Sequence, residues 1–302
     1  MSKAPMIRTT TVAALLLAVA PLWALPRAAP SGRVAECAGR RIASWSVDSG
    51  HTAEFARYGD VNARMNDWTG GDGTHSVRLP DGRTVWLFSD TFLDRIQPPP
   101  NPQGQKRRWR TADTGGVPLL RHNSAAVMSR SGRPVRTLTG GTAAASGPFF
   151  PGSWRFRDGA HWRRQAGRAG PVLRAGGRRG VGSAFTVVRD GPAWVLITMD
   201  TGGDGAAGIR ASTSYWSCSP HGPWHGPDGR LTPPRPPAPD PQHVAVYNPQ
   251  IHPEFTANRE FLLSYDVNWL GPPGVPADPR VNGDVELYRP RFLRVRMGPA
   301  GR

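Results

Sequence analysis

The sequence predicts an all-β chain. A five-bladed β-propeller is the architecture its turn spacing favours, and a β-sandwich is the alternative. The 36 glycines and 32 prolines suit a chain of many turns, while 11 tryptophans supply an aromatic core. Short runs of β-branched and aromatic residues flank Asp-Gly or Ser-Gly turns, and no long amphipathic helix stands out after the first segment. The clear turns are separated by about 50 to 70 residues, which is roughly what a four-stranded blade with its loops needs.

The chain opens with a predicted export signal. Lys3 and Arg8 precede the apolar run Val12–Leu25, which is shorter than the roughly 20 residues of a membrane span. We therefore expect a secreted protein with no membrane attachment once the signal is removed. The expected organisation is a signal peptide over residues 1–30, with cleavage between 24 and 36, followed by one propeller domain over residues 37–298.

The net charge of +16 comes almost wholly from arginine, because only Lys3 and Lys106 among the 38 basic residues are lysine. Such a skew, together with abundant Ala, Gly and Pro, is typical of a GC-rich genome. The functional alternative is attraction to an anionic polymer. No RNA- or DNA-binding motif accompanies the charge, so no nucleic-acid partner is expected.

The two cysteines, Cys37 and Cys218, lie far apart in the sequence. In an oxidising compartment they are candidates for a disulfide that ties the mature N-terminus to a distant strand. The alternative is two buried free thiols. Two thiols without a C-x-x-C spacing do not indicate a metal site.

The stretch "GGDGTHSVRLPDGRTVWLFSD", residues 70–90, is predicted to be a hairpin that turns at Asp81–Gly82. Counting outward from that turn places Asp72 opposite Asp90 or Thr91. Opposed side chains lie about 5 Å apart, so two carboxyl groups would meet at one end of one sheet. Such a pair separates the two pKa values, which is the arrangement that glycoside hydrolysis uses. The alternative is that both aspartates only cap strand ends.

Other candidate residues lie where predicted strands begin or end. "DGPAWVLITMD" ends on Asp200, "NREFLLSYD" ends on Asp266, and Glu254 is one of few glutamates. We expect Asp200 and Glu254 to be reserve catalytic carboxylates. The expected sugar-binding residues, drawn from "RHNSAAV", "YNPQIHPEF" and "LLSYDVN", are His122, Asn123, Tyr247, Asn248, His252 and Asp266. A turn or a structural histidine is the alternative for these polar clusters.

Three proline-rich stretches without periodicity are predicted to be loops: residues 94–116, 228–242 and 270–284. Further hairpin turns are predicted at Ser131–Gly132, Asp190–Gly191 and Asn258–Arg259, and "WRFRDGAHW" at 154–162 is a weaker hairpin candidate.

The blocks "WTGGDGTHSVRLPDGRTVWLFSDTFL", "RHNSAAV", "SPHGPWHGP", "YNPQIHPEF", "LLSYDVN" and "YRPRF" occur in that order between Trp68 and Phe292. In this the chain resembles a secreted actinobacterial family of unknown function related to the endo-D-arabinanases of mycobacterial cell-wall breakdown. Those enzymes in turn resemble the five-bladed propeller glycosidases. The resemblance implies that Asp72 and Asp90 are catalytic. It leaves the clan's glutamate acid unmatched, because no glutamate occurs between Glu54 and Glu254.

The sequence therefore predicts a glycoside hydrolase for a furanose-containing polysaccharide such as a D-arabinan. Asp72 is expected to be its base or nucleophile, and Asp90 its acid or pKa-tuning partner. The alternative is a propeller without catalysis that binds a glycan or a protein at the cell envelope. We expect a monomer and no cofactor; some propellers of this clan hold calcium on the axis, but no ligand set here identifies a site.

Overall fold

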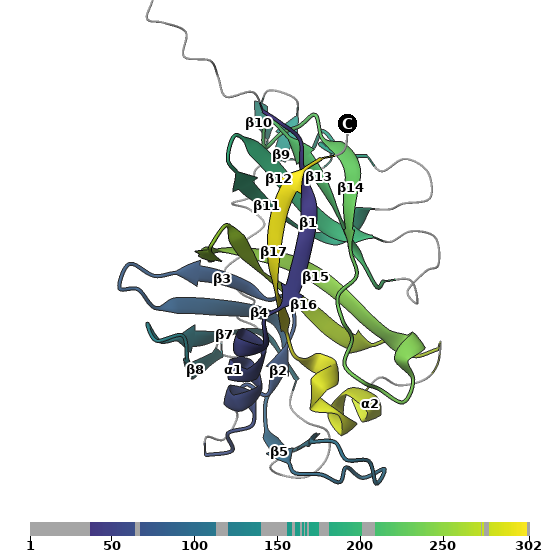
Figure 1. The fold of residues 1–302 in the computed structure, drawn as a ribbon. Helices are drawn as coiled ribbons and strands as arrows, with labels where there is room; N and C mark the ends of the chain where they lie inside the picture. Colours follow the sequence, from purple (N-terminus) through teal and green to yellow (C-terminus); the bar gives the residue numbers. More distant parts are fainter. Residues whose placement is uncertain are drawn as a thin grey trace, which may run out of the picture. The chain divides into compact units, whose positions relative to one another are not determined.

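The chain forms a series of antiparallel sheets in a computed structural model (Figure 1). The structure describes residues 37–63, 67–112, 120–139, 156–158, 161–163, 169–174, 181–200, 209–272 and 278–300, with the single residues 165, 167 and 274. The signal peptide expected at 1–30 lies outside these residues. Cys37–Arg302 constitutes one compact unit. No helix in the described ranges is long and apolar enough to span a membrane.

Three large sheets are meanders of neighbouring strands. The first contains β2 (Gly70–Gly71), β3 (His75–Arg78), β4 (Thr84–Phe92), β7 (Leu120–Met128) and β8 (Pro134–Thr139), in the order β2–β4–β7–β8 with β3 also paired to β4. The second contains β11 (Val181–Asp190), β12 (Ala193–Asp200), β13 (Ser212–Ser217) and β14 (His225–Leu231). The third contains β15 (Val244–Ala257), β16 (Glu260–Trp269), β17 (Arg291–Pro299) and β1 (Arg40–Val47).

The remaining elements are short. Two ladders of two strands pair β5 (Arg95–Gln97) with β6 (Trp109–Thr111) and β9 (Phe156–Asp158) with β10 (His161–Arg163). The helices are α1 (Ser49–Gly59), η4 (Pro241–His243), α2 (Asp278–Gly283) and η5 (Val285–Tyr288).

The third sheet joins the two ends of the described chain. β1 pairs antiparallel with β17, so that Trp45 lies opposite Val295, and the two strands run side by side in Figure 1. Completing the last blade with a strand from the N-terminal side is how a propeller ring is closed, and it leaves fewer free strand edges.

The first strands of the sheets run in the same direction next to one another. Ser76 in β3 bonds His252 in β15, and Arg78 bonds the Glu254 carbonyl, both at a separation of 176 positions. Gln250 and Ile251 in β15 bond residues of β11 at a constant separation of 65. A constant difference in residue number means that paired strands are parallel, which is expected of the inner strands around a propeller axis.

The all-β prediction is confirmed, and these sheets are those of a β-propeller rather than a two-layer sandwich. Between β8 and β11 the structure describes β9, β10 and a few neighbouring residues. The predicted turns at Ser131–Gly132, Asp190–Gly191 and Asn258–Arg259 are confirmed, and β9 pairs with β10 inside the weaker candidate.

The prediction of plain loops in the proline-rich stretches was wrong in part. Residues 94–116 contain β5 and β6, residues 228–242 contain the end of β14 and η4, and residues 270–284 contain α2. These elements are short and are fixed by contacts with other segments. Arg110 in β6, for example, donates to the carbonyl of Val281 in α2 at 2.6 Å. Hydrophobic periodicity within a short segment gives no information about contacts between residues so far apart in the sequence.

Aromatic side chains fill the core beneath α1. Phe55 of α1 packs against Trp68, Trp86 and Phe292, with ring centroids 5.1 to 5.5 Å apart. The helix is capped by Asp48, whose carboxylate accepts from the His51 amide at 2.9 Å. The tryptophan-rich composition thus supplies the predicted aromatic core, which includes Trp86 and Phe88 of the strand that leads to Asp90.

The two cysteines are joined in a disulfide between Cys37, just before β1, and Cys218, just after β13, with Cα atoms 5.6 Å apart. The bond ties the strand that completes the third sheet to the second sheet. Because it closes a loop spanning 181 positions, its entropic effect on the unfolded chain is large, about 5 kcal/mol in the chain-entropy treatment.

Reduction of this disulfide is expected to lower the melting temperature by roughly 10 °C, which thermal denaturation with and without reductant would measure. A double variant with serine at Cys37 and Cys218 should melt like the reduced protein and ignore the reductant. A wild-type melting temperature that does not change on reduction would show that β1 is held without the bond.

Candidate functional site

The first hairpin places Asp72 directly opposite Asp90. Gly71 pairs with Thr91 on one side of them and His75 with Leu87 on the other, so the register is continuous. The Asp72 amide donates to the Asp90 carbonyl at 3.0 Å. The first of the two positions expected for Asp72, opposite Asp90 rather than Thr91, is therefore the observed one.

Two of the surrounding glycines are required by close contacts. A Cβ on Gly70 would overlap the Tyr288 carbonyl oxygen, which is backbone and cannot move aside. Gly73 has φ +66°, which disfavours other residues, and its Cβ would overlap the Ser89 side chain. The "GGDG" motif thus allows the backbone at Tyr288 to approach closely before Asp72 and allows a left-handed conformation directly after it.

Buried arginines fix the segment that leads into Asp72. The carbonyl of Thr69 accepts from Arg289 Nε at 2.8 Å and from Arg110 Nη2 at 3.2 Å. Arg110 is 2 % exposed, and burial, together with the charge of Arg289, lowers its pKa to about 9. Its guanidinium also donates to the carbonyl of Tyr288 at 3.4 Å. Arg110 therefore links the segment that precedes Asp72 to the segment that carries Tyr288.

The Asp72 carboxylate is half-buried and receives three hydrogen bonds. Tyr247 donates its hydroxyl to Oδ2 at 2.7 Å, the Asp90 amide donates to Oδ1 at 3.1 Å, and the Tyr288 hydroxyl donates as well. Burial raises the pKa of Asp72, the donors oppose that rise, and the neighbouring Asp90 charge adds to it. The charge of Asp90 therefore affects the ionisation of Asp72.

Asp90 has a more open environment. Its side chain is 41 % exposed, and Oδ1 lies 2.5 Å from Nδ1 of His122, which is 77 % exposed. Asn123 follows in β7 with φ +60° and is also exposed. The hairpin thus presents one shielded and one accessible carboxyl group, with two polar side chains at its edge.

Asp266 lies behind Asp72 and is fully buried. Its Oδ2 accepts from the Gly73 amide at 2.6 Å and from Asn248 Nδ2 at 3.2 Å, and its Oδ1 accepts from the Thr74 hydroxyl at 2.8 Å. Burial and the Asp72 charge raise the pKa of Asp266 to about 7 against these three bonds. A side chain without exposed surface does not reach a sugar, so Asp266 has hydrogen-bonding partners within the site instead of the expected sugar contact. Asn248 is partly exposed, and its expected sugar contact stays a prediction.

Asp200 lies at the same end of the sheets. It pairs with Val181, and the constant separation between β11 and β15 places Val181 level with Val246. Its side chain is 8 % exposed, and Arg230 Nε approaches it at 3.7 Å. Asp200 therefore lies at about the same height along the neighbouring strands as Tyr247, but its side chain is largely buried.

Glu254 and His252 lie toward the other end of β15. Glu254 is about seven residues from Tyr247, or roughly 20 Å along a strand, so the structure does not bring it to the aspartates. His252 is 1 % exposed, and its ring nitrogens bond Ser76 at 2.5 Å and Ser264 at 2.8 Å. Burial lowers the pKa of His252 to about 3, which makes it a neutral core residue rather than a sugar ligand.

Two residues of the site were not expected from the sequence. Tyr288 ends η5, where no strand pattern or acidic spacing draws attention to it, although it begins the "YRPRF" block. Thr74 is buried within the first hairpin. Both contact the aspartates through hydroxyl groups whose partners are remote in sequence, and single-sequence periodicity carries no information on such partners.

Tyr288→Phe is expected to raise the pKa of Asp72, because the lost hydroxyl stabilises the ionised form. A titration of the side-chain carboxyl carbons by NMR, with aspartate labelled at that atom, would measure the change. Tyr265→Phe is the matched control, since its hydroxyl donates to the Pro234 carbonyl at 2.8 Å. An Asp72 titration that is the same in all three proteins would show that the Tyr288 bond is not made in solution.

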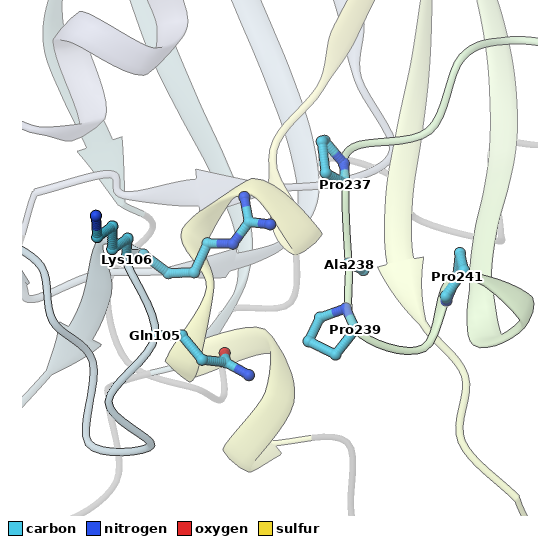
Figure 2. A pocket seen from close by; sticks show the side chains of 7 residues that line it. Gln105, Lys106, Pro237, Ala238, Pro239 and Pro241 are labelled. Atoms are coloured by element: carbon cyan, nitrogen blue, oxygen red, sulfur yellow. The ribbon is translucent and has the colours of Figure 1, made fainter.

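One cavity is lined by none of these aspartates. It has a volume of about 750 Å³, with the loop Gln105–Arg107 on one side and the segment Pro237–Pro241 on the other (Figure 2). Its lining residues include no carboxylate and no aromatic side chain, so it lacks the paired acids and the stacking surface expected of a sugar site. Among the described residues, no group of three or more His, Cys, Asp or Glu side chains is placed to hold a metal ion.

Fold and site together define an all-β protein of the propeller class with a polar centre built on aspartates and tyrosines. The chain belongs to the DUF5005 family, described as "Domain of unknown function", which it matches over residues 56–110 and 143–297. Among the curated proteins none matches the chain.

Several solved structures are similar at low identity. A candidate hydrolase from Bacteroides ovatus is 14 % identical, with 83 % of this chain and 90 % of that chain covered and a TM-score of 0.42. A xylan β-1,4-xylosidase from Bacillus halodurans is 13 % identical, with 78 % and 43 % covered and a TM-score of 0.27. An exo-β-1,3-galactanase from Phanerochaete chrysosporium is 10 % identical, with 74 % and 45 % covered and a TM-score of 0.23. At these TM-scores the likenesses say nothing about the reaction of this chain.

Proposed function

We propose that this chain is a secreted glycoside hydrolase that cleaves a furanose-containing polysaccharide through Asp72 and Asp90. The observation that carries the proposal is the direct opposition of Asp72 and Asp90 in the hairpin, with one carboxyl group shielded by tyrosines and the other open to solvent. Such a pair can keep one proton on one carboxyl while the other stays ionised, and glycoside hydrolysis requires both forms at once.

The substrate class rests on different support. The block from Trp68 to Leu93 resembles the endo-D-arabinanases, so we favour a D-arabinan of a cell envelope. Export rests on the N-terminal segment 1–30. Arabinogalactan incubated with the full mature chain should release oligosaccharides, and chromatography of the soluble products would detect them.

A second candidate is a propeller that binds an envelope glycan without cleaving it. The observation that favours it is the position of Glu254, which leaves the aspartates without a glutamate acid. Retention on an arabinogalactan resin without soluble products at any pH would support the binder. Product release would exclude it.

A further inference from the structure

The cavity shown in Figure 2, which we call the proline-walled cavity, has two walls that differ in chemistry. On one side it is lined by residues whose side chains carry no hydrogen-bond donor: Pro237, Ala238, Pro239 and Pro241. On the other side it is lined by three consecutive residues of one loop: Gln105, Lys106 and Arg107. The lining side chains that can bind a polar ligand therefore all come from that loop.

The orientation of the Gln105 amide follows from its neighbour Asn101. Asn101 Oδ1 accepts from the Gln105 backbone N–H at 2.8 Å, and Asn101 Nδ2 donates to the Gly283 carbonyl at 2.8 Å, so backbone groups fix both ends of the Asn101 amide. Nδ2 also donates to Gln105 Oε1 at 3.0 Å. The Gln105 oxygen therefore faces Asn101, and its Nε2 group is left to donate. Figure 2 shows this side chain extending from the loop toward Pro239.

The cavity carries positive charge, because two of its lining side chains are cations and none is a carboxylate. The Lys106 ammonium forms no hydrogen bond or ion pair with the described residues. Arg107 pairs through Nε with Asp284 at 3.4 Å, and 30 % of its side chain is exposed. Asp240, which lies between two of the lining prolines, is paired with Arg280 at 3.2 Å. No carboxylate in the described part of the chain therefore neutralises Lys106.

Both walls are held in place by contacts within the protein. The loop is closed by the Asn101 backbone N–H, which donates to the Gln105 carbonyl at 2.9 Å. On the opposite wall, proline rings fix the backbone angle φ, and the Tyr265 hydroxyl donates to the Pro234 carbonyl at 2.8 Å. A preformed site loses little conformational freedom when a ligand binds, which favours affinity.

The chemistry of the two walls selects the class of ligand. A volume of about 750 Å³ is within the usual range for ligand sites. An amide, an ammonium and a guanidinium group side by side are suited to an oxyanion, because all three only donate toward it. No aromatic side chain lines the cavity, so it lacks the surface on which neutral sugars and single-stranded nucleic acids stack. The ligand that fits is a carboxylate or phosphate group on a chain whose C–H groups pack against the prolines.

We infer that the proline-walled cavity binds the carboxylate or phosphate groups of an anionic polymer, with Gln105, Lys106 and Arg107 as the contact residues. The site is separate from Asp72 and Asp90 and goes beyond the proposed function. The net charge of +16 attracts such a polymer to the chain as a whole, whereas the cavity gives the polymer one defined place.

The test is isothermal titration calorimetry of the full mature chain with two probes, inorganic polyphosphate and polygalacturonate. We expect at least one of them to bind the wild type. Lys106→Ala should weaken that binding by at least about tenfold, the effect of losing one hydrogen bond to a charged group. Arg133→Ala is the matched control: Arg133 is exposed at the turn between β7 and β8, and its loss lowers the net charge equally but should change the affinity far less.

Gln105→Glu tests the donor role of the amide without changing the shape of the side chain. Glutamate keeps an oxygen that accepts from Asn101, so the loop should fold as before. The Nε2 donor becomes a carboxylate oxygen that repels an anion, so the affinity should again fall by at least about tenfold. This variant also lowers the net charge by one, so Arg133→Ala is its control as well.

A second measurement detects contact with Lys106 directly. Lys106 is the only lysine after the predicted signal peptide, so mass spectrometry can follow its acylation by an amine-reactive ester at a single side chain. Bound polymer should slow this acylation. An acylation rate that stays the same when the polymer saturates the protein would contradict the inference.

The two probes distinguish the possible anions. Binding of polyphosphate alone would assign phosphate, and binding of polygalacturonate alone would assign carboxylate; either result supports the site when it depends on Lys106 and Gln105. Binding of neither probe would overturn the inference. So would an equal loss in Lys106→Ala and Arg133→Ala, because the attraction would then follow net charge.

The titration needs no cleavage, so this inference and the proposed function can fail separately. The double variant Asp72→Asn/Asp90→Asn should bind the anionic probe with the wild-type affinity. A chain that cleaves no glycan but binds the probe through Lys106 would lose the proposed function and keep this inference. An active hydrolase that binds neither probe would keep the function and lose the inference.

Discussion

Replacing Asp72 with Asn should reduce hydrolysis by roughly 10²- to 10⁴-fold, the range for a lost general acid or base. Asn keeps an oxygen to accept from the Asp90 amide and offers an amide to the Tyr247 hydroxyl, so the local hydrogen bonds survive. It carries no charge, so the burial that disfavours ionisation of Asp72 no longer costs stability. The melting temperature should therefore stay the same or rise slightly while product release falls.

Asp81→Asn is the matched control for this variant. Asp81 lies at the turn of the same hairpin and forms an exposed ion pair with Arg83 at 2.7 Å, far from the tyrosines. Exposed pairs contribute about 0 to 1 kcal/mol, so neither activity nor stability should change much. Equal activity of the Asp72 and Asp81 variants would mean that Asp72 has only a structural role.

Asp90→Asn should produce a loss of similar size, roughly 10²- to 10⁴-fold, because the accessible carboxyl group can no longer exchange a proton during the reaction. Its side chain is 41 % exposed and its partner His122 is still more exposed, so the fold should tolerate the change. The rate of product release over a range of pH would measure the effect.

His122→Gln separates the carboxylate from its partner. If the histidine only orients Asp90, this variant should lose far less activity than Asp90→Asn and keep the shape of the pH profile. A loss in His122→Gln as large as that in Asp90→Asn would instead make the imidazole part of the catalytic pair, and the catalytic role of Asp90 would have to be abandoned.

Much of the first hairpin follows from sequence because its determinants are local. Asp81–Gly82 fixes the turn, the alternation of residues fixes the register, and the register then fixes Asp72 opposite Asp90. The same reasoning predicts the turns that join β7 to β8, β11 to β12 and β15 to β16.

The other contacts of the site join residues that are far apart in the sequence, so the spacing of motifs could not predict them. Tyr247 and Asp72 are separated by 175 positions, and Asp266 and Gly73 by 193, so their contacts exist only once the sheets assemble. Sequence reasoning included Tyr247 and Asp266 as polar strand residues but placed both toward a sugar. Burial, which depends on what covers a strand, is what gives Asp266 and His252 other roles.

The strand that completes the third sheet shows the same limit. Arg40–Val47 has no pattern that names β17 as its partner, and the pairing joins residues from opposite ends of the chain. The sequence offered one clue to the position of this strand. Cys37, which precedes the strand, was expected to form a disulfide with Cys218.

The most direct test of the central claim compares the wild type with the double variant Asp72→Asn/Asp90→Asn on arabinogalactan, measuring bound glycan and released reducing ends in the same samples. The account predicts that both proteins bind the glycan and that only the wild type releases reducing ends. Release by the double variant at the wild-type rate would contradict it, because the cleavage would then come from residues other than this pair.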